Sequence, residues 1–113
     1  MILFKTTSSP FGGRTRTRVL VALRLMESTY PRELSRLLAV SINGVRQALT
    51  SLERDGLVVG RPVGRTRVYQ INPRFFARQE LEALLSRLAD VDPELRERTA
   101  AVRRRPRRVG KPQ

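Results

Sequence analysis

The stretch 31–56 constrains the fold most, because two helical hydrophobic patterns follow each other there with almost no chain between them. Apolar residues recur at intervals of three and four, first at Leu34, Leu37 and Leu38 and then at Val45, Ala48, Leu49 and Leu52. Such spacing puts each set on one face of a helix. Ala39 and Val40 form too short a link for two helices to run antiparallel, so we expect a helix-turn-helix corner.

Residues at the ends of both patterns are typical helix start and stop signals. Pro31 suits the first position of a helix, where a missing N–H costs nothing. The Ser41 hydroxyl can accept a hydrogen bond from a free backbone N–H at the start of the second helix. Gly56 can adopt the left-handed conformation that ends many helices. These signals predict that the second helix covers residues 41–55.

The net charge indicates the class of partner. The chain has 113 residues, with 23 Lys and Arg against 10 Asp and Glu, so its formal net charge is +13. Such an excess predicts a polyanionic partner, either nucleic acid or an anionic membrane surface. No apolar run approaches the ~20 residues that span a bilayer, and the opening MILF is too short for a secretory signal. We therefore expect no membrane span and a cytoplasmic location, which in a bacterium or archaeon includes the nucleoid.

Two missing residue types limit the chemistry of the chain, which contains neither Cys nor His. Their absence excludes disulfides, a thiol nucleophile, and thiolate or imidazole metal ligands. Asp90, Asp92 and Glu94 are closely spaced carboxylates, but they flank Pro93, where helix capping and solvation explain them. We expect no enzyme activity, no metal site and no cofactor.

The N-terminal part predicts a short extension followed by a helix. Residues 1–13 are typical of an extended segment and a turn, and we expect the apolar MILF to pack on the domain or on a second subunit. A helix is predicted over residues 15–28. Arg14, Arg16 and Arg18 at its start oppose the helix dipole. An anionic ligand nearby would relieve this mismatch, and simple solvation is the alternative.

After Gly56 the hydrophobic period changes from that of a helix to that of a strand. Arg67, Tyr69 and Ile71 alternate on one face, and together with residues 57–59 they predict a hairpin around a loop at 60–64 that contains Gly and Pro.

Asn72 and Pro73 predict the start of a further helix, running over residues 74–90. Its leucine seam either closes the core or pairs with a second subunit, and consists of Leu81, Leu84, Leu85 and Leu88.

Residues 91–113 predict a basic, disordered tail, which leaves 14–90 as the folded domain. From Pro93 the chain is a polar stretch that is helical at best. The arginines of the tail either strengthen DNA association without sequence preference or only solubilise the chain. They are Arg103, Arg104, Arg105, Arg107 and Arg108.

The order helix, helix, turn, helix, hairpin, helix is that of a winged helix-turn-helix domain. This is an α+β, mainly α fold with a two-stranded wing and a C-terminal dimerisation helix. Over roughly residues 14–90 the chain resembles the ArsR-like family of bacterial and archaeal transcriptional regulators. The most specific matches are Glu33-Leu34, Ser41 with Val45 and Leu49, Leu52-Glu53, Gly56-Leu57-Val58 and Val68-Tyr69-Gln70-Ile71-Asn72-Pro73.

The resemblance implies a homodimer whose first and last helices form the interface. Its two recognition helices would read a pseudo-palindromic site, with half-sites one helical turn or ~34–36 Å apart. Many members of the family sense metals through Cys, His or acidic ligands. This chain departs from that pattern because it has no Cys or His. A soft-metal sensor is therefore excluded, and no effector is assigned.

The outward face of the second corner helix carries side chains that can read base edges in the major groove. Arg pairs with guanine, and Asn or Gln with adenine, each good pair giving about 1–3 kcal/mol of discrimination. Gly44 would let the helix approach the groove closely. The alternative is the ordinary polar face of a surface helix. The predicted recognition residues are Ser41, Asn43, Gly44, Arg46, Gln47 and Thr50.

Further arginines are candidates for contacts to the DNA backbone. Arg61, Arg65 and Arg67 lie around the hairpin tip, where they can follow phosphates or enter a minor groove. A solvated hairpin whose charges prevent edge pairing is the alternative. Arg32 and Arg36 are candidate phosphate contacts of the first corner helix, and plain surface charge is the alternative there.

These features favour a sequence-specific, homodimeric DNA-binding transcriptional regulator that acts as a repressor. An architectural, nucleoid-associated protein would use the same fold with little sequence preference. A specific regulator should favour its own site by ~10³ or more. An RNA-binding module would display stacking aromatics, which are few here. An antitoxin-type partner protein would also use the MILF segment and the leucine seam.

Overall fold

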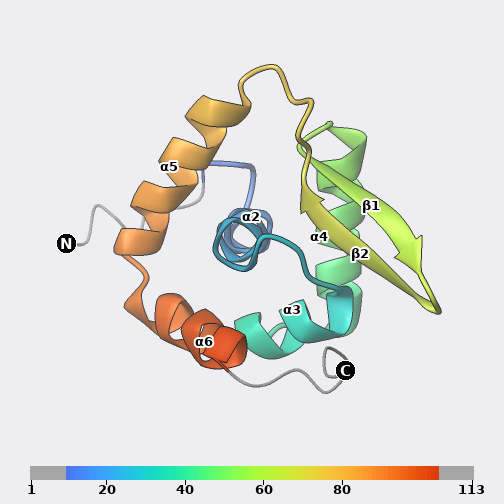
Figure 1. Cartoon of the computed structure of the whole chain (residues 1–113), viewed down its shortest axis with the longest axis horizontal. Coiled ribbons are helices and arrows are strands. Elements are labelled where there is room, and N and C mark those ends of the chain that lie inside the picture. The colour runs from blue at the N-terminus through green and yellow to red at the C-terminus, as the bar shows by residue number, and fades with distance from the viewer. Residues whose placement is uncertain (1–9, 105–113) are drawn as a thin grey trace.

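The computed structural model describes residues 10–104, which fold around one central helix. Figure 1 shows α2 end-on, with the other helices and the hairpin arranged around it. The expected mainly helical winged helix-turn-helix architecture, with a two-stranded wing, is confirmed. None of the described helices is long and apolar enough to cross a membrane. In chain order the elements are α2 (Arg14–Met26), α3 (Pro31–Leu38), α4 (Ile42–Arg54), β1 (Val58–Val63), β2 (Thr66–Ile71), α5 (Arg78–Asp90) and α6 (Pro93–Arg104).

The central helix α2 is buried on nearly every side. Its five consecutive residues 19–23 are all core residues, a pattern typical of a helix that is covered all round. The helix ends at Met26, earlier than the predicted Ser28, because Glu27 takes a positive φ of 74°. A helix enclosed in this way offers little surface to a partner. The part of this helix in a homodimer interface, which the resemblance implies, stays a prediction.

The predicted helix-turn-helix corner is present between α3 and α4. Ala39 adopts the left-handed conformation with φ 56°, and the Ser35 hydroxyl donates to the Val40 carbonyl oxygen (2.6 Å). The Gly44 N–H donates to the Ser41 hydroxyl oxygen (3.0 Å), so Ser41 is the N-cap of α4 as expected. Gly56 has φ 82° and closes the other end of the helix.

The wing is longer than the sequence pattern predicts. Strands β1 and β2 pair in register from Val58 with Ile71 to Val63 with Thr66, so residues 60–63 belong to a strand and not to a loop. Gly60 makes this possible, because a Cβ there would lie 2.7 Å from the ring of Tyr69. The ring of Tyr69 on β2 can therefore pack directly against the backbone of Gly60 on β1.

The helix α5 begins at Arg78 and not at the predicted position 74. The Asn72 side chain instead ties the hairpin to the corner, since its amide donates to the Gly56 carbonyl oxygen (3.0 Å). Its side-chain oxygen also accepts from the Arg74 N–H (2.9 Å), and turns follow as far as residue 77. Asn72 thus caps a turn and not the helix.

The prediction that the tail begins at residue 91 is wrong for residues 93–104, which form α6. Leu95 is fully buried and Thr99 nearly so, and Asp92 accepts from the Leu95 N–H (3.2 Å) as a helix cap. Burying one leucine fully contributes roughly 1.5–3 kcal/mol. The folded domain therefore reaches at least to residue 104. The MILF segment and the arginines at 105, 107 and 108 lie outside the described residues.

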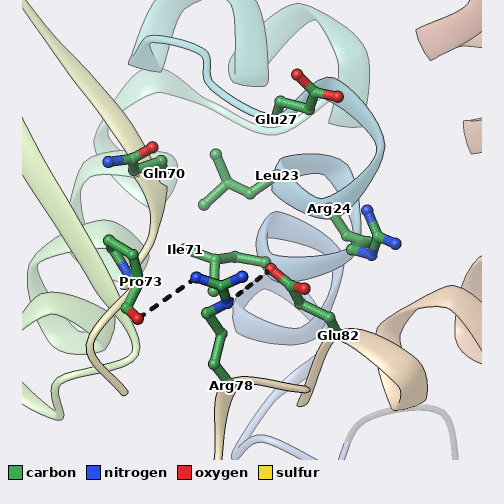
Figure 2. A pocket seen from close by; sticks show the side chains of 8 residues that line it. All are labelled: Leu23, Arg24, Glu27, Gln70, Ile71, Pro73, Arg78 and Glu82. Carbon is green, nitrogen blue, oxygen red and sulfur yellow. Dashed lines mark hydrogen bonds and ion pairs between the residues drawn. The ribbon is translucent and has the colours of Figure 1, made fainter. Parts of the chain in front are cut away.

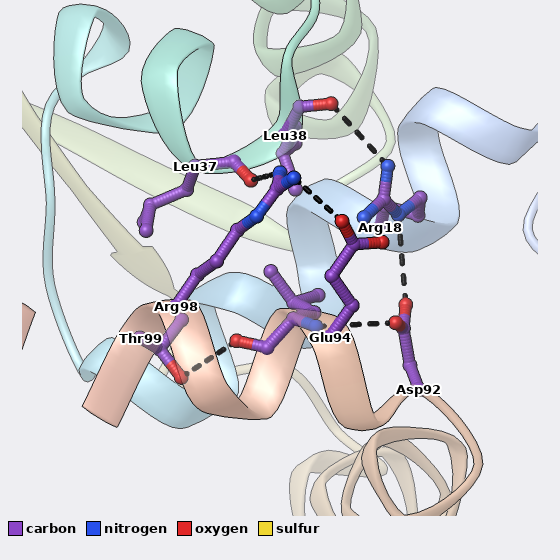
Figure 3. Close-up of polar contacts among 8 residues, drawn as sticks. Arg18, Leu37, Leu38, Asp92, Glu94, Arg98 and Thr99 are labelled. Atoms are coloured by element: carbon purple, nitrogen blue, oxygen red, sulfur yellow. Dashed lines mark hydrogen bonds and ion pairs between the residues drawn. The ribbon is translucent and has the colours of Figure 1, made fainter. Parts of the chain in front are cut away.

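Arginines on α2 and α6 hold the C-terminal end of α3 (Figure 3). Arg98 donates to the Leu37 carbonyl oxygen (2.8 Å), and Arg18 to that of Leu38 (3.3 Å). Basic side chains at the end of a helix satisfy its free carbonyl groups and interact favourably with its dipole. The C-terminal end of α3 is therefore anchored to both α2 and α6.

Candidate nucleic-acid interface

The outer face of α4 is polar and exposed over its whole length. Residues 45, 48, 49 and 52 are buried, as the hydrophobic pattern predicts. The side chains on the opposite face are exposed and define what we call the α4 face: Asn43, Arg46, Gln47, Thr50 and Arg54. With Ser51 they line a shallow depression in the surface. The α4 face presents two guanidinium groups and two carboxamide groups. Arg54 donates to the Ser51 hydroxyl (3.4 Å), and within residues 10–104 no hydrogen bond engages the side chains of Asn43, Arg46 and Gln47.

Two of the predicted recognition residues, Ser41 and Gly44, contribute to the local structure of the helix-turn-helix corner. The Ser41 hydroxyl accepts the capping hydrogen bond of α4. A Cβ on Gly44 would lie 3.0 Å from Val40 Cγ1 and 3.2 Å from Ser41 Oγ. The missing side chain of Gly44 thus points toward the turn and not outward. The role of Gly44 in DNA recognition stays a prediction, and its small size avoids a close contact with Val40 and Ser41.

The three wing arginines have different surroundings. Arg61 and Arg65 are exposed, and among the described residues neither forms an ion pair. Arg67 donates to Glu53 on α4 (Nη2 to Oε2, 3.0 Å) and lies over the Tyr69 ring, 5.7 Å from its centroid. The hydrogen bond to Glu53 raises the pKa of Arg67 above its ordinary value. Arg67 therefore joins the wing to α4, whereas Arg61 and Arg65 remain available.

Two of the three arginines at the start of α2, Arg16 and Arg18, are compensated within the chain. Arg16 hydrogen-bonds to the Ser51 hydroxyl and forms an ion pair with Asp55 (3.0 Å) at the C-terminal end of α4. Arg18 lies 3.6 Å from the Asp92 carboxylate. Both pairs bridge segments far apart in the sequence, and nothing local in the sequence indicates them. They relieve the mismatch with the helix dipole without any external anion.

The surface around the corner is positive because arginines outnumber carboxylates there, and the carboxylates are engaged within the chain. Glu53 and Asp55 pair with arginines, and the Glu33 carboxylate accepts from the Thr29 hydroxyl (2.5 Å). Arg32 and Arg36, the predicted backbone contacts on α3, are both exposed. Exposed arginines of α3, α4 and the wing thus lie together without an equal number of free carboxylates. Such a surface attracts a polyanion.

A second depression lies away from the α4 face, between α2, the end of β2 and the start of α5 (Figure 2). The Arg78 guanidinium lies there between the Pro73 carbonyl oxygen (3.5 Å) and the Glu82 carboxylate (3.7 Å). Its charge is therefore already compensated. In the part of the chain that the structure describes, no three acidic residues come together as metal ligands.

The four leucines of the predicted seam differ in their exposure. Leu81 and Leu85 are buried in the core of their own chain, where α5 packs against α2. Leu88 is partly buried against the same core, and Leu84 is exposed. The seam therefore closes the core through Leu81 and Leu85, and Leu84 is left at the surface.

Comparison with solved structures identifies the fold. The chain is similar to the transcriptional regulator HlyU from Vibrio vulnificus, with 26% identity, 80% of this chain and 83% of that chain covered, and a TM-score of 0.59. Reduced HlyU from Vibrio cholerae gives 25% identity, coverage of 80% and 84%, and a TM-score of 0.55. The adhesin competence repressor AdcR from Streptococcus pyogenes gives 17% identity, coverage of 86% and 71%, and a TM-score of 0.63. No protein-family model and no curated sequence matches the chain.

Proposed function

This chain has the winged helix-turn-helix fold of transcriptional regulators, and we propose that it regulates transcription as a homodimer that binds a specific DNA sequence. The observation that carries the proposal is the α4 face. This face is exposed, contains no acidic side chain and is rich in groups that can pair with bases. We infer that Arg46 pairs with a guanine and that Asn43 or Gln47 pairs with an adenine. Each such pair supplies about 1–3 kcal/mol of discrimination.

Contacts to the DNA backbone supply most of the affinity in this proposal. Arg32 and Arg36 on α3 and Arg61 and Arg65 on the wing are exposed, so each can reach a phosphate when α4 enters the groove. Arg67 has a different role. It holds the wing next to α4 through its ion pair with Glu53, and so positions the wing arginines relative to the recognition helix.

We propose repression as the mode of regulation. A protein bound across a promoter excludes the polymerase sterically and needs no further protein contact to do so. We propose that the chain acts on DNA in the cytoplasm, at the nucleoid.

The second candidate function is an architectural DNA-binding protein, which the net charge of +13 favours. Phosphate contacts alone give affinity without sequence preference, and that affinity falls steeply with salt.

Selection of bound duplexes from a random pool separates the two functions. The proposal predicts an enriched inverted repeat, with half-sites ~34–36 Å apart and an affinity ~10³ or more above that for scrambled DNA. Failure to enrich any sequence, with affinity that collapses between two salt concentrations, would favour the architectural function.

A further inference from the structure

The depression between α2, the end of β2 and the start of α5 has a volume of about 210 Å³. Figure 2 shows the apolar side chains of Leu23 and Ile71 at its centre, with polar side chains from all three elements around them. We call it the α2 depression. It is smaller than the ~300–1,000 Å³ of pockets for drug-sized ligands, so only a small molecule fits. The polar side chains that line it are Arg24, Glu27, Gln70, Arg78 and Glu82.

Two of the four charged groups in the α2 depression are engaged with each other. The Arg78 Nε lies 3.7 Å from the Glu82 carboxylate, and the Arg78 Nη1 donates to the Pro73 carbonyl oxygen (3.5 Å). This pair leaves Arg24 and Glu27 as the charges of the depression that the described residues do not compensate.

Arg24 has a buried donor that is not used. Its Nε is buried, and within residues 10–104 it has no hydrogen-bond partner. A buried N–H without a partner costs free energy, and native proteins rarely leave one in that state. The planar guanidinium group matches a carboxylate well. A carboxylate bound in the depression would therefore supply the partner that Arg24 lacks.

Glu27 is locally unfavourable in three respects. Its φ is 74° and its ψ is −48°, a conformation that residues with a side chain rarely adopt. It lies at the C-terminal end of α2, where the helix dipole disfavours a carboxylate. In the described part of the chain no hydrogen bond or ion pair engages its exposed side chain. Such a residue is typical of a functional site, and a bound ammonium group would compensate its charge.

The balance of charges in the α2 depression limits the class of ligand. Two arginines and two glutamates line it, so a phosphate or a dicarboxylate would meet carboxylates as well as guanidinium groups. A polyamine would meet the arginines in the same way. One unpaired cation and one unpaired anion, three residues apart beside an apolar floor, favour a ligand that carries both charges and an apolar group.

We propose that the α2 depression binds a free α-amino acid with an apolar side chain. Its carboxylate binds Arg24 and its ammonium group binds Glu27. The apolar side chain contacts Ile71 and Pro73, and the Gln70 carboxamide supplies a neutral hydrogen-bonding group. The inference concerns a ligand and does not rest on the proposed binding of DNA.

The α2 depression is connected to the wing. The Thr29 N–H donates to the Tyr69 carbonyl oxygen (3.1 Å), and the Tyr69 N–H donates to that of Thr29 (2.8 Å). The segment that carries Glu27 is thus attached to β2, whose Gln70 lines the depression. A ligand that binds the closed arrangement opposes its opening. Bound amino acid should therefore slow the amide exchange of residues 66–71.

A titration of the full chain, followed by NMR, tests the class of ligand. The probes are L-leucine, L-valine and L-methionine, with leucinamide and 4-methylpentanoate as matched compounds that each lack one charge of leucine. At least one amino acid should give saturable shifts of the amides at 23–28 and 70–71. Leucinamide and 4-methylpentanoate should bind at least about tenfold more weakly than leucine, because each leaves a charged group of the protein without its partner.

Two results of the titration would overturn the proposal. One is the absence of saturable shifts with all three amino acids. The other is equal binding of leucine and of either compound that lacks a charge, since the carboxylate or the ammonium group would then not be recognised. A chain that selects a DNA site but binds no amino acid would overturn this inference and leave the proposed function intact.

The variant Glu27→Gly separates binding from folding. Glycine adopts a φ of 74° without strain, so the midpoint of thermal unfolding should rise by a few degrees. Leucine binding should nevertheless weaken about tenfold or more, as it should in Arg24→Gln. Arg87→Gln, an exposed position of α5 outside the depression, is the control and should leave leucine binding unchanged. Undiminished leucine binding in Glu27→Gly would contradict the proposal.

Discussion

Arg67 on the wing and Glu53 on α4 form a hydrogen-bonded ion pair of 3.0 Å that joins the two elements proposed to contact DNA. The pair spans 14 residues of sequence. Because the pKa of Arg67 is raised above its already high ordinary value, the guanidinium stays charged throughout the accessible pH range. The pair therefore links the wing to α4 through an exposed contact, which salt screens.

Breaking this pair should loosen the wing. We expect hairpin amides to exchange with solvent faster in Arg67→Gln and in Glu53→Gln, and no faster in the double variant than in the faster single one. The reason is that the two residues contribute one shared interaction. The measurement is hydrogen exchange of residues 58–71, with Arg65→Gln as the control that should match the wild type. Additive effects in the double variant would show that the pair is not the shared cause.

The corner should not gain stability from Gly44→Ala. Replacing glycine by alanine inside a helix ordinarily stabilises it by up to about 1 kcal/mol. At Gly44 the new Cβ would lie 3.0 Å from Val40 and also crowd the capping hydroxyl of Ser41. We therefore expect urea unfolding to give a free energy of unfolding no higher than that of the wild type. A gain near 1 kcal/mol would mean that the corner has room for a methyl group.

The helix α6 should be part of the cooperative fold. Leu95→Ala should lower the free energy of unfolding by about 2–5 kcal/mol, because Leu95 is fully buried and its removal leaves a cavity. Ala101→Ser on the exposed side of α6 is the matched control and should change it by less than about 0.5 kcal/mol. Equal stability of the two variants would place α6 outside the core.

The wing should contribute equally to the binding affinity for all DNA sequences. Arg65→Ala is expected to weaken binding to selected and scrambled duplexes by the same factor, since a phosphate carries no sequence information. The slope of log affinity against log salt concentration should fall by about 1. Thr66→Ala, at the neighbouring exposed position, should leave both quantities unchanged. A loss confined to the selected duplex would instead show that Arg65 reads bases.

The sequence predicts the corner because local signals agree there. The leucine spacing, Ser41 and Gly56 all act within a few residues, and the structure places each of them as expected. The alternation of Arg67, Tyr69 and Ile71 likewise predicts the wing. It does not predict that Gly60 belongs to a strand, because that position is set by the Tyr69 ring on the facing strand.

What the sequence could not predict depends on contacts between distant residues. The helix α6 has one buried leucine in a charged run, and it is held by contacts such as that of Arg98 with the Leu37 carbonyl group, 61 residues away. The leucines of α5 suggest one seam, but packing against α2 buries Leu81 and Leu85 and leaves Leu84 outside.

The central claim, that α4 reads bases, is tested most directly by a ratio of affinities for the selected duplex and for a scrambled one. For the wild type this ratio should be ~10³ or more. In Arg46→Ala and in Gln47→Ala it should fall about tenfold or more, because each side chain supplies about 1–3 kcal/mol of discrimination. Arg36→Ala should weaken both affinities and preserve the ratio. Unchanged ratios in both α4 variants, with folding intact, would contradict the claim.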